Sequence, residues 1–328
     1  MPATSANLGP GFDALGLALT LHDEVEARVT ASGLDIEVSG EGAADVADAR
    51  EKHLIVRAMR AAFDELGGGQ PPGIALRCVN RIPHGRGLGS SAAAIVAGVL
   101  AARALGGVSV AADDALPLAN HLEGHPDNVA PCLYGGLTVA WTIDGPGTVA
   151  RAVRLDPLAA VKPVVIIAPA PVSTEVARGL LPRSVPHRDA ARNAGRAALL
   201  IAALTRRPEA LLDATEDRLH QDYRAPAMPA THDLVARLRA AGVPAVVSGA
   251  GPSVLAFLDS GDSGILGASG APISDTLSSG APRMASLHDA LDILDSTVKE
   301  TGIDWHISPL DIERTGASVV PEAASSTR

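Results

Sequence analysis

The sequence predicts an α+β fold in two domains, and three observations lead to this prediction. Segments that alternate like strands and segments with apolar residues at helical spacing follow one another along the whole chain. The chain has 328 residues, of which 47% are hydrophobic and 20% charged, so two ordinary hydrophobic cores fit within it. Its composition changes near Gly145-Pro146-Gly147, which places the domain boundary between residues 1–150 and residues 151–328.

The first domain opens with residues 2–13, which we interpret as a polar loop. Because a strand usually leads into such a loop, we expect the first strand of the fold to be absent here. Apolar residues alternate over 25–29 and again over 34–38, which predicts a hairpin that turns near Ser32-Gly33. The other expected elements are a helix over 53–66, a strand over 74–79, a helix capped by Ser90 or Ser91 and ending at Gly106-Gly107, a helix over 111–122, a loop over 123–131 and a strand over 136–141.

The second domain begins with a continuous apolar segment over 161–168, which predicts a buried strand. The elements expected after it are a short helix capped by Ser173 or Thr174, a helix over 189–205, a helix that ends at His220–Arg224, a strand, glycine turn and strand over 246–258, a helix over 286–301 and a strand over 304–310. Residues 259–282 follow neither periodicity, so we expect a mobile insertion there. A loose tail is expected over 320–328.

Composition excludes several classes of function. A net charge of −10 and few aromatic residues argue against a nucleic-acid surface, which needs a basic patch with stacking platforms. No apolar segment approaches the roughly 20 residues of a membrane span, and the first residues lack a signal-peptide pattern, so we expect a cytoplasmic protein that binds no membrane. The two cysteines, Cys78 and Cys132, are expected to be buried free thiols.

The most informative segment is a glycine-rich loop between an expected strand and an expected helix. Gly85, Gly87 and Gly89 lie within five residues and lead directly into the helix. Free backbone N–H groups and the positive end of the helix dipole would meet there, which suits a triphosphate. The loop matches neither the Walker loop nor the dinucleotide fingerprint, because Ser90 stands where each requires glycine. From the loop alone, a purely structural turn stays open.

Taken with two other glycine-bearing segments, this loop makes the chain resemble the GHMP kinases, a family of small-molecule kinases. Its residues, Pro83-His84-Gly85-Arg86-Gly87-Leu88-Gly89-Ser90-Ser91-Ala92-Ala93, are similar to the phosphate loop of that family. Residues 248–253 look like its third motif. Residues 2–13 and 125–131 look specifically like the members of the family that act on homoserine. The resemblance covers roughly residues 2–258.

The resemblance implies a fold and a reaction. The fold implied is a two-domain α+β chain, with the phosphate loop in a left-handed βαβ unit of the first domain and a ferredoxin-like second domain. The reaction implied is phosphorylation of the L-homoserine hydroxyl by ATP with Mg²⁺, giving O-phospho-L-homoserine, a step toward threonine. A homodimer is left open.

The resemblance also assigns the binding residues. Residues 83–93 would bind ATP, and Ser91 and Glu123 match the magnesium ligands; a hydroxyl and a carboxylate are the hard oxygen donors that Mg²⁺ takes. Homoserine is a zwitterion, so its pocket needs charges of both signs. The residues that match the pocket are Arg178 and Arg224 for the carboxylate, Asp13 for the ammonium group, and Asn7 and His125 for further hydrogen bonds.

Asn128 and Thr174 would orient the hydroxyl for in-line attack. An amide cannot accept a proton at neutral pH, so Asn128 implies catalysis without a protein general base. Asp127 is the competing base, and we interpret it as a turn acid.

Two alternatives remain from the sequence. The first is a kinase of the same family for mevalonate or a sugar; mevalonate has no ammonium group, which would leave Asp13 without a purpose. The second is a non-catalytic binding protein of the same fold, which predicts loss of the magnesium ligands, whereas Ser91 and Glu123 are both present.

Overall fold

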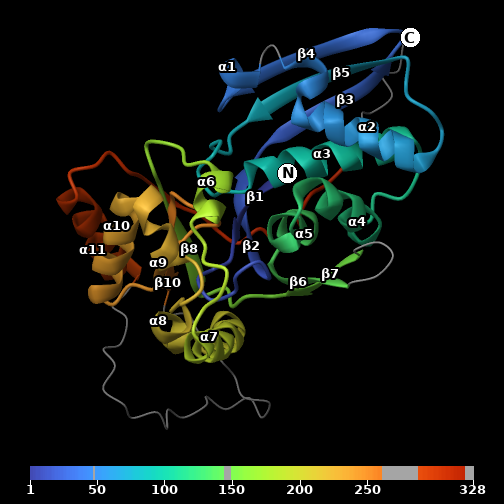
Figure 1. Ribbon diagram of the computed structural model, residues 1–328. Helices are drawn as coiled ribbons and strands as arrows, with labels where there is room; N and C mark the ends of the chain where they lie inside the picture. Colours follow the sequence, from blue (N-terminus) through green and yellow to red (C-terminus); the bar gives the residue numbers. More distant parts are fainter. Residues whose placement is uncertain (47–48, 144–148, 261–286, 322–328) are drawn as a thin grey trace.

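The structure is a computed structural model that describes residues 1–46, 49–143, 149–260 and 287–321. It forms two adjoining halves, with the N-terminal elements on one side and the C-terminal elements on the other (Figure 1). The expected insertion and the expected tail fall largely outside the described residues. Within those residues, no helix combines the length and the apolar character that a bilayer span requires.

The first sheet is antiparallel and carries the N-terminal residues of the chain. Its strand order is β1 (Pro2–Ala6), β2 (Leu15–His22), β6 (Leu137–Ile143) and β7 (Val149–Leu155). The interpretation of residues 2–6 as a loop was therefore wrong, as was the expectation of a missing first strand. Thr4 and Ser5 are fully buried in β1, and these polar residues conceal the apolar pattern of a buried strand.

The second sheet corrects the expected hairpin. Its order is β3 (Glu24–Thr30), β5 (Gly73–Asn80) and β4 (Gly33–Gly40), so β5 lies between the two strands that were expected to pair. β5 runs antiparallel to β3 and parallel to β4. Both flanking strands have the same alternation, and alternation alone does not identify the partner.

Helices connect these strands and lead to the glycine loop. They are α1 (Ala43–Val46), η1 (Arg50–Lys52), α2 (Leu54–Leu66), α3 (Ser90–Leu105), α4 (Ala112–Glu123) and α5 (Pro126–Tyr134). The parallel pairing makes β4, α2 and β5 a βαβ unit, and the glycine loop follows its last strand. The left-handed sense of the unit stays a prediction. Part of the expected loop over 123–131 is helical, because Pro126 at the first position of α5 has a φ suited to a helix start.

The C-terminal sheet is antiparallel, with the order β11 (His306–Pro309), β8 (Val161–Ile167), β10 (Val254–Asp259) and β9 (Ala245–Val247). Its helices are α6 (Thr174–Gly179), α7 (His187–Thr205), η2 (Pro208–Ala210), α8 (Leu211–Ala214), α9 (Gln221–Arg224), η3 (Ala225–Ala227), α10 (Pro229–Ala240) and α11 (Leu287–Glu300). Strand, helices, two strands, helix and strand follow in the β-α-β-β-α-β succession of a ferredoxin-like domain, as expected.

One detail of this half differs from expectation. Arg224 does not end a longer helix but belongs to α9, a short helix that starts at Gln221. The Asp217 carboxylate accepts hydrogen bonds from the backbone N–H groups of His220 and Gln221, so the polypeptide turns there. This turn brings His220 and Arg224 against the N-terminal residues.

The two halves share one hydrophobic cluster, and each half also has a cluster of its own. Leu17 and Val96 of the first half and Val165, Leu255 and Phe257 of the second belong to the same buried cluster. β7 runs across the boundary expected between residues 150 and 151 and pairs with β6, so the domain limits stay a prediction. Both expected thiols, Cys78 and Cys132, are free and buried.

Candidate active site

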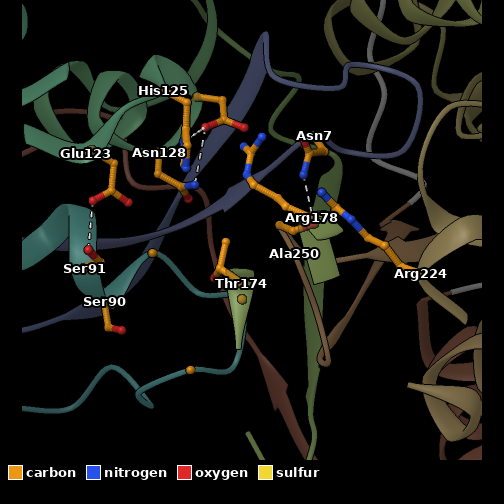
Figure 2. A pocket seen from close by; sticks show the side chains of 15 residues that line it. Asn7, Ser90, Ser91, Glu123, His125, Asn128, Thr174, Arg178, Arg224 and Ala250 are labelled. Atoms are coloured by element: carbon orange, nitrogen blue, oxygen red, sulfur yellow. Dashed lines mark hydrogen bonds and ion pairs between the residues drawn. The ribbon is translucent and has the colours of Figure 1, made fainter. Parts of the chain in front are cut away.

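One cavity collects residues from both halves of the molecule (Figure 2). They come from the end of β1, the glycine loop, the start of α3, the α4–α5 junction, α6, α9 and the turn between β9 and β10. The lining residues are Asn7, Gly85, Gly87, Gly89, Ser90, Ser91, Glu123, His125, Asp127, Asn128, Thr174, Arg178, Arg224, Gly249 and Ala250. The structure thus brings together most of the residues that the sequence singled out, although they are spread over more than 200 positions.

The glycine loop is packed too closely for side chains at two of its positions. A Cβ atom on Gly87 would collide with the carbonyl oxygen of Ser248, and one on Gly89 would collide with Thr4. Both glycines also have positive φ angles of 73° and 71°. Gly89 is the N-cap residue of α3, and Ser90 begins the helix, so the expectation that Ser90 or Ser91 caps the helix was wrong.

Arg86 anchors the glycine loop through hydrogen bonds to backbone carbonyl oxygens. Its Nε donates to the carbonyl oxygen of Ala168 at 2.8 Å, Nη1 to that of His84 at 2.9 Å and Nη2 to that of Pro169 at 2.9 Å. All three guanidinium nitrogens are therefore used on backbone carbonyls, and Arg86 does not line the cavity.

The remaining loop residues named from the sequence support the loop through packing. The side chains of Leu88, Ala92 and Ala93 are buried in the shared core. Pro83 and His84 lie before the lining part of the loop, and neither lines the cavity. Leu88, Ala92 and Ala93 likewise do not line the cavity.

Ser91 and Glu123 form an oxygen pair at the cavity wall. The Ser91 hydroxyl donates to Glu123 Oε2 at 2.8 Å, which joins the start of α3 to the end of α4 (Figure 2). Burial raises the pKa of Glu123, and the hydrogen bond from Ser91 offsets only part of this. Among the described residues no three His, Cys, Asp or Glu side chains cluster as a metal site. One hydroxyl and one carboxylate suit Mg²⁺, which keeps its other ligands from phosphate and water.

The first turn of α5 fixes the orientation of Asn128. Asn128 Oδ1 accepts a hydrogen bond from the Thr4 hydroxyl at 2.8 Å, and its Nδ2 lies 3.5 Å from Asp127 Oδ1. That carboxylate oxygen also accepts from His125 Nδ1 at 2.6 Å, and Asp127 is only 1% exposed. Burial alone would lower the pKa of His125, but the neighbouring Asp127 carboxylate outweighs it and raises the pKa.

Arg178 and Asp13 form a bidentate ion pair between α6 and the N-terminal loop. Arg178 Nη2 lies 2.7 Å from Asp13 Oδ1, and Nη1 lies 3.3 Å from Oδ2. The backbone N–H of Asp13 donates to Asn7 Oδ1 at 2.9 Å, which holds the loop in place. Thr174 lies one helical turn before Arg178, and both line the cavity, whereas Asp13 does not line it.

Arg224 is a buried cation without a carboxylate partner among the described residues. It is 1% exposed, and its Nη1 donates to the carbonyl oxygen of Gly249 at 3.1 Å and to His220 Nδ1 at 3.1 Å. Asn7 Nδ2 donates to the same Gly249 oxygen at 2.8 Å. Arg224 Nε is buried with no hydrogen-bond partner. A buried guanidinium group at a cavity wall, with no carboxylate hydrogen-bonded to it among the described residues, is suited to an anionic ligand group.

Sequence reasoning missed three residues that support this site. Phe12 stacks on His220 with ring centroids 5.2 Å apart, and the guanidinium carbons of Arg178 and Arg224 lie 6.0 Å and 5.5 Å from its ring centroid. Thr4 orients Asn128. The position of His220 one helical turn before Arg224 was the available signal, whereas Phe12 and Thr4 contact the site only through the tertiary fold.

Comparison with known proteins shows which family this chain resembles. Residues 53–136 match the family model for the GHMP kinases N terminal domain, and residues 191–267 match the model for the GHMP kinases C terminal domain. Homoserine kinase of Streptomyces coelicolor is 54% identical over 99% of this chain and 95% of its own length. Homoserine kinase of Streptomyces avermitilis is 53% identical over 99% and 95%.

Solved structures of proteins with the same name as these relatives are also similar to this chain. Homoserine kinase from Cytophaga hutchinsonii superposes with a TM-score of 0.73 at 26% identity, covering 96% of this chain and 94% of its own. A putative homoserine kinase from Listeria monocytogenes gives 0.70 at 28% identity, covering 98% of both chains. Mevalonate kinase from L. major, at 14% identity and a TM-score of 0.62, shares the fold, covering 96% of this chain and 95% of its own. By its near full-length relatives and its two domain matches, this chain is a member of the GHMP kinase family.

Proposed function

We propose that this protein transfers the γ-phosphoryl group of ATP to the side-chain hydroxyl of L-homoserine, giving O-phospho-L-homoserine and ADP. The observation that carries the proposal is a cavity that combines a glycine loop at a helix start with two guanidinium groups, those of Arg224 and of Arg178, and Arg178 is in turn paired with Asp13. The near full-length relatives named homoserine kinase support the same acceptor.

ATP would bind at the glycine loop. Its backbone N–H groups and the start of α3 offer donors to the phosphates, and the loop contains no lysine to assist them. Ser91 and Glu123 would hold Mg²⁺, because their oxygens already lie 2.8 Å apart at the cavity wall. The metal would neutralise charge on the phosphates during transfer.

The amino-acid substrate would bind on the opposite side of the cavity. Arg178 and Arg224 suit its carboxylate, since guanidinium groups bind carboxylates through paired hydrogen bonds. Asp13 suits its ammonium group, and Asn7 and His125 would add hydrogen bonds. A substrate without an ammonium group, such as mevalonate, would leave Asp13 unused, so the geometry favours an amino acid.

Catalysis would rely on orientation. Asn128 and Thr174 line the cavity and would align the substrate hydroxyl with the γ-phosphate. Asp127 is the nearest carboxylate to Asn128, but it is buried and already accepts hydrogen bonds from its two neighbours. A loose transition state for phosphoryl transfer demands little early proton removal, so no protein base is required.

The testing experiment is an ADP-release assay with L-homoserine at varied Mg²⁺. Wild-type protein should release ADP only with both present. Glu123→Gln should lose at least about 100-fold in kcat/KM at limiting Mg²⁺, whereas Asp114→Asn, an exposed acid on the same helix, should not. ADP release with mevalonate or a sugar in place of L-homoserine would point to another kinase of the family. If no ADP is released with any of these acceptors, the protein would be a binding protein.

The cytoplasmic location, the absence of nucleic-acid and membrane binding, and the oligomeric state stay predictions.

A further inference from the structure

His220 occupies a buried position between Arg224 and the N-terminal loop. Its side chain is fully buried, and its two ring nitrogens face different partners. Nδ1 lies 3.1 Å from Arg224 Nη1, and Nε2 lies 2.9 Å from the carbonyl oxygen of Gly9. The imidazole ring also stacks on Phe12, with an angle of 24° between the ring planes.

These two partners permit only one protonation state. A guanidinium group can only donate hydrogen bonds, and a carbonyl oxygen can only accept them. Nδ1 must therefore carry a lone pair, and Nε2 must carry the proton. Burial lowers the pKa of His220, which favours this neutral ring, although the nearby Asp217 carboxylate acts in the opposite direction.

The same contacts determine where the guanidinium of Arg224 points. Nη1 is held by His220 and by the carbonyl oxygen of Gly249, and the plane of the group lies near the Phe12 ring. No carboxylate among the described residues hydrogen-bonds to it. Arg224 lines the cavity (Figure 2). Its position there depends on His220, Gly249 and Phe12 rather than on an ion pair within the described residues.

We propose that His220 is a positioning residue for substrate binding: its Nδ1 lone pair fixes Arg224 Nη1, so that the other donors of the guanidinium remain free for the carboxylate of the amino-acid substrate. An acid in place of His220 would pair with Arg224 and reduce its charge toward a ligand. A neutral acceptor orients the cation and leaves its charge available. This inference rests on the proposed function, in which Arg224 receives that carboxylate.

The first test compares His220→Leu with His220→Asn. Leucine and asparagine have nearly the same shape, but only asparagine places an acceptor oxygen where Nδ1 lies. His220→Leu should raise KM for L-homoserine about ten-fold or more, because Arg224 loses an acceptor for a charged donor. His220→Asn should recover most of that loss. KM for ATP should change less than about two-fold in both.

The second test asks whether the effect passes through Arg224. In an Arg224→Met background, adding His220→Leu should raise KM for L-homoserine no further, since the group that it positions is gone. Equal effects of the Leu and Asn variants, or additive effects in the double variant, would overturn the proposal and reduce His220 to a packing residue.

A third measurement does not depend on the substrate or on folding of the variants. The ¹⁵N shifts of the His220 ring in wild-type protein near pH 7 should show the neutral tautomer with the proton on Nε2. The opposite tautomer or an imidazolium would overturn the proposal even if the kinase activity is present. Conversely, the protein could show the expected tautomer and yet release no ADP with L-homoserine. The missing ADP release would then contradict the proposed substrate, and the KM series would be repeated with the hydroxyl acceptor that the assay identifies.

Discussion

Asp13 accepts two hydrogen bonds from the guanidinium of Arg178, which lines the cavity, and the side chains of Asp13 and Arg178 are 38% and 34% exposed. The proposed substrate carries the same two charges. Its ammonium group would approach Asp13 and its carboxylate would approach Arg178, so under the proposed function the ion pair would act as a template for a zwitterion.

This relationship predicts how the protein selects its substrate. Wild-type protein should prefer L-homoserine over 4-hydroxybutyrate, which lacks the ammonium group, by about 100-fold or more in kcat/KM. Asp13→Asn should reduce that preference to less than about ten-fold, because the residue proposed to recognise the ammonium group has lost its charge. Steady-state kinetics with both acceptors measures the ratio. A ratio that stays unchanged in the variant would show that Asp13 only supports Arg178.

Arg86 provides a second prediction, about the phosphate loop. Arg86→Met should raise KM for ATP about ten-fold, since the loop loses three hydrogen bonds to backbone carbonyls near the end of β8 and within the loop itself. KM for L-homoserine should stay within about two-fold of wild type.

The matched variant for this prediction is Arg86→Lys. One ammonium group cannot reach three carbonyl oxygens served by a planar fork, so Lys should restore little of the ATP affinity. Full recovery with Lys would mean that positive charge near the phosphates matters, and not the anchoring of the loop.

The local parts of this structure could be predicted from the sequence, since their signals lie within a few residues. β5, the glycine loop and α3 follow one another, and their periodicities are clear. β1 could not be predicted, because Thr4 and Ser5 are buried while their hydroxyls take part in hydrogen bonds with Asn128 and Ser248 from distant segments.

The other features that the sequence did not predict involve residues that lie far apart along the chain. β3 and β4 are neighbours in sequence and look like a hairpin, but the partner that separates them starts more than 30 residues later. In the site, Ser91, Glu123 and Arg178 were named from resemblance to a family. The contacts of His220 with Gly9 and Phe12 cross about 200 residues, and no local pattern indicates them.

Asn128 yields a prediction about mechanism. Asn128→Asp should lower kcat by about ten-fold or more, because a carboxylate there would face the buried Asp127 carboxylate, and like charges disfavour ionisation. The hydrogen bond from Thr4 would no longer orient an amide. The pH dependence of kcat measures the outcome. Undiminished turnover with a new acidic pKa would show that a base at this position is useful and would contradict catalysis by orientation alone.

The two cysteines should be unreactive in the folded protein. Burial raises the pKa of Cys78 to about 11 and that of Cys132 to about 12, so almost no thiolate exists near pH 8. A thiol reagent such as 5,5′-dithiobis(2-nitrobenzoate) should label neither residue in native protein and both after unfolding in urea. Rapid labelling of the native protein would show that one thiol is accessible.

The His125–Asp127 pair should make part of the stability depend on pH. The pKa of His125 is raised in the folded protein, so its protonated ring pairs with Asp127 more favourably than in the unfolded chain. This contribution is fully present below the unfolded pKa of His125, and it disappears as the pH rises through the higher folded pKa. His125 should therefore contribute more to the stability of the folded protein near pH 6 than near pH 9.

The comparison uses His125→Asn, whose amide can still donate a neutral hydrogen bond to Asp127 at either pH. The difference in Tm between wild type and this variant should be larger near pH 6, by on the order of 1 °C, while the contributions of groups unaffected by the substitution cancel. A difference that grows toward pH 9 would mean that the folded protein disfavours the charged ring. The desolvation of His125 would then outweigh its attraction to Asp127, and the pair would act at neutral pH only as a neutral hydrogen bond that orients the first turn of α5.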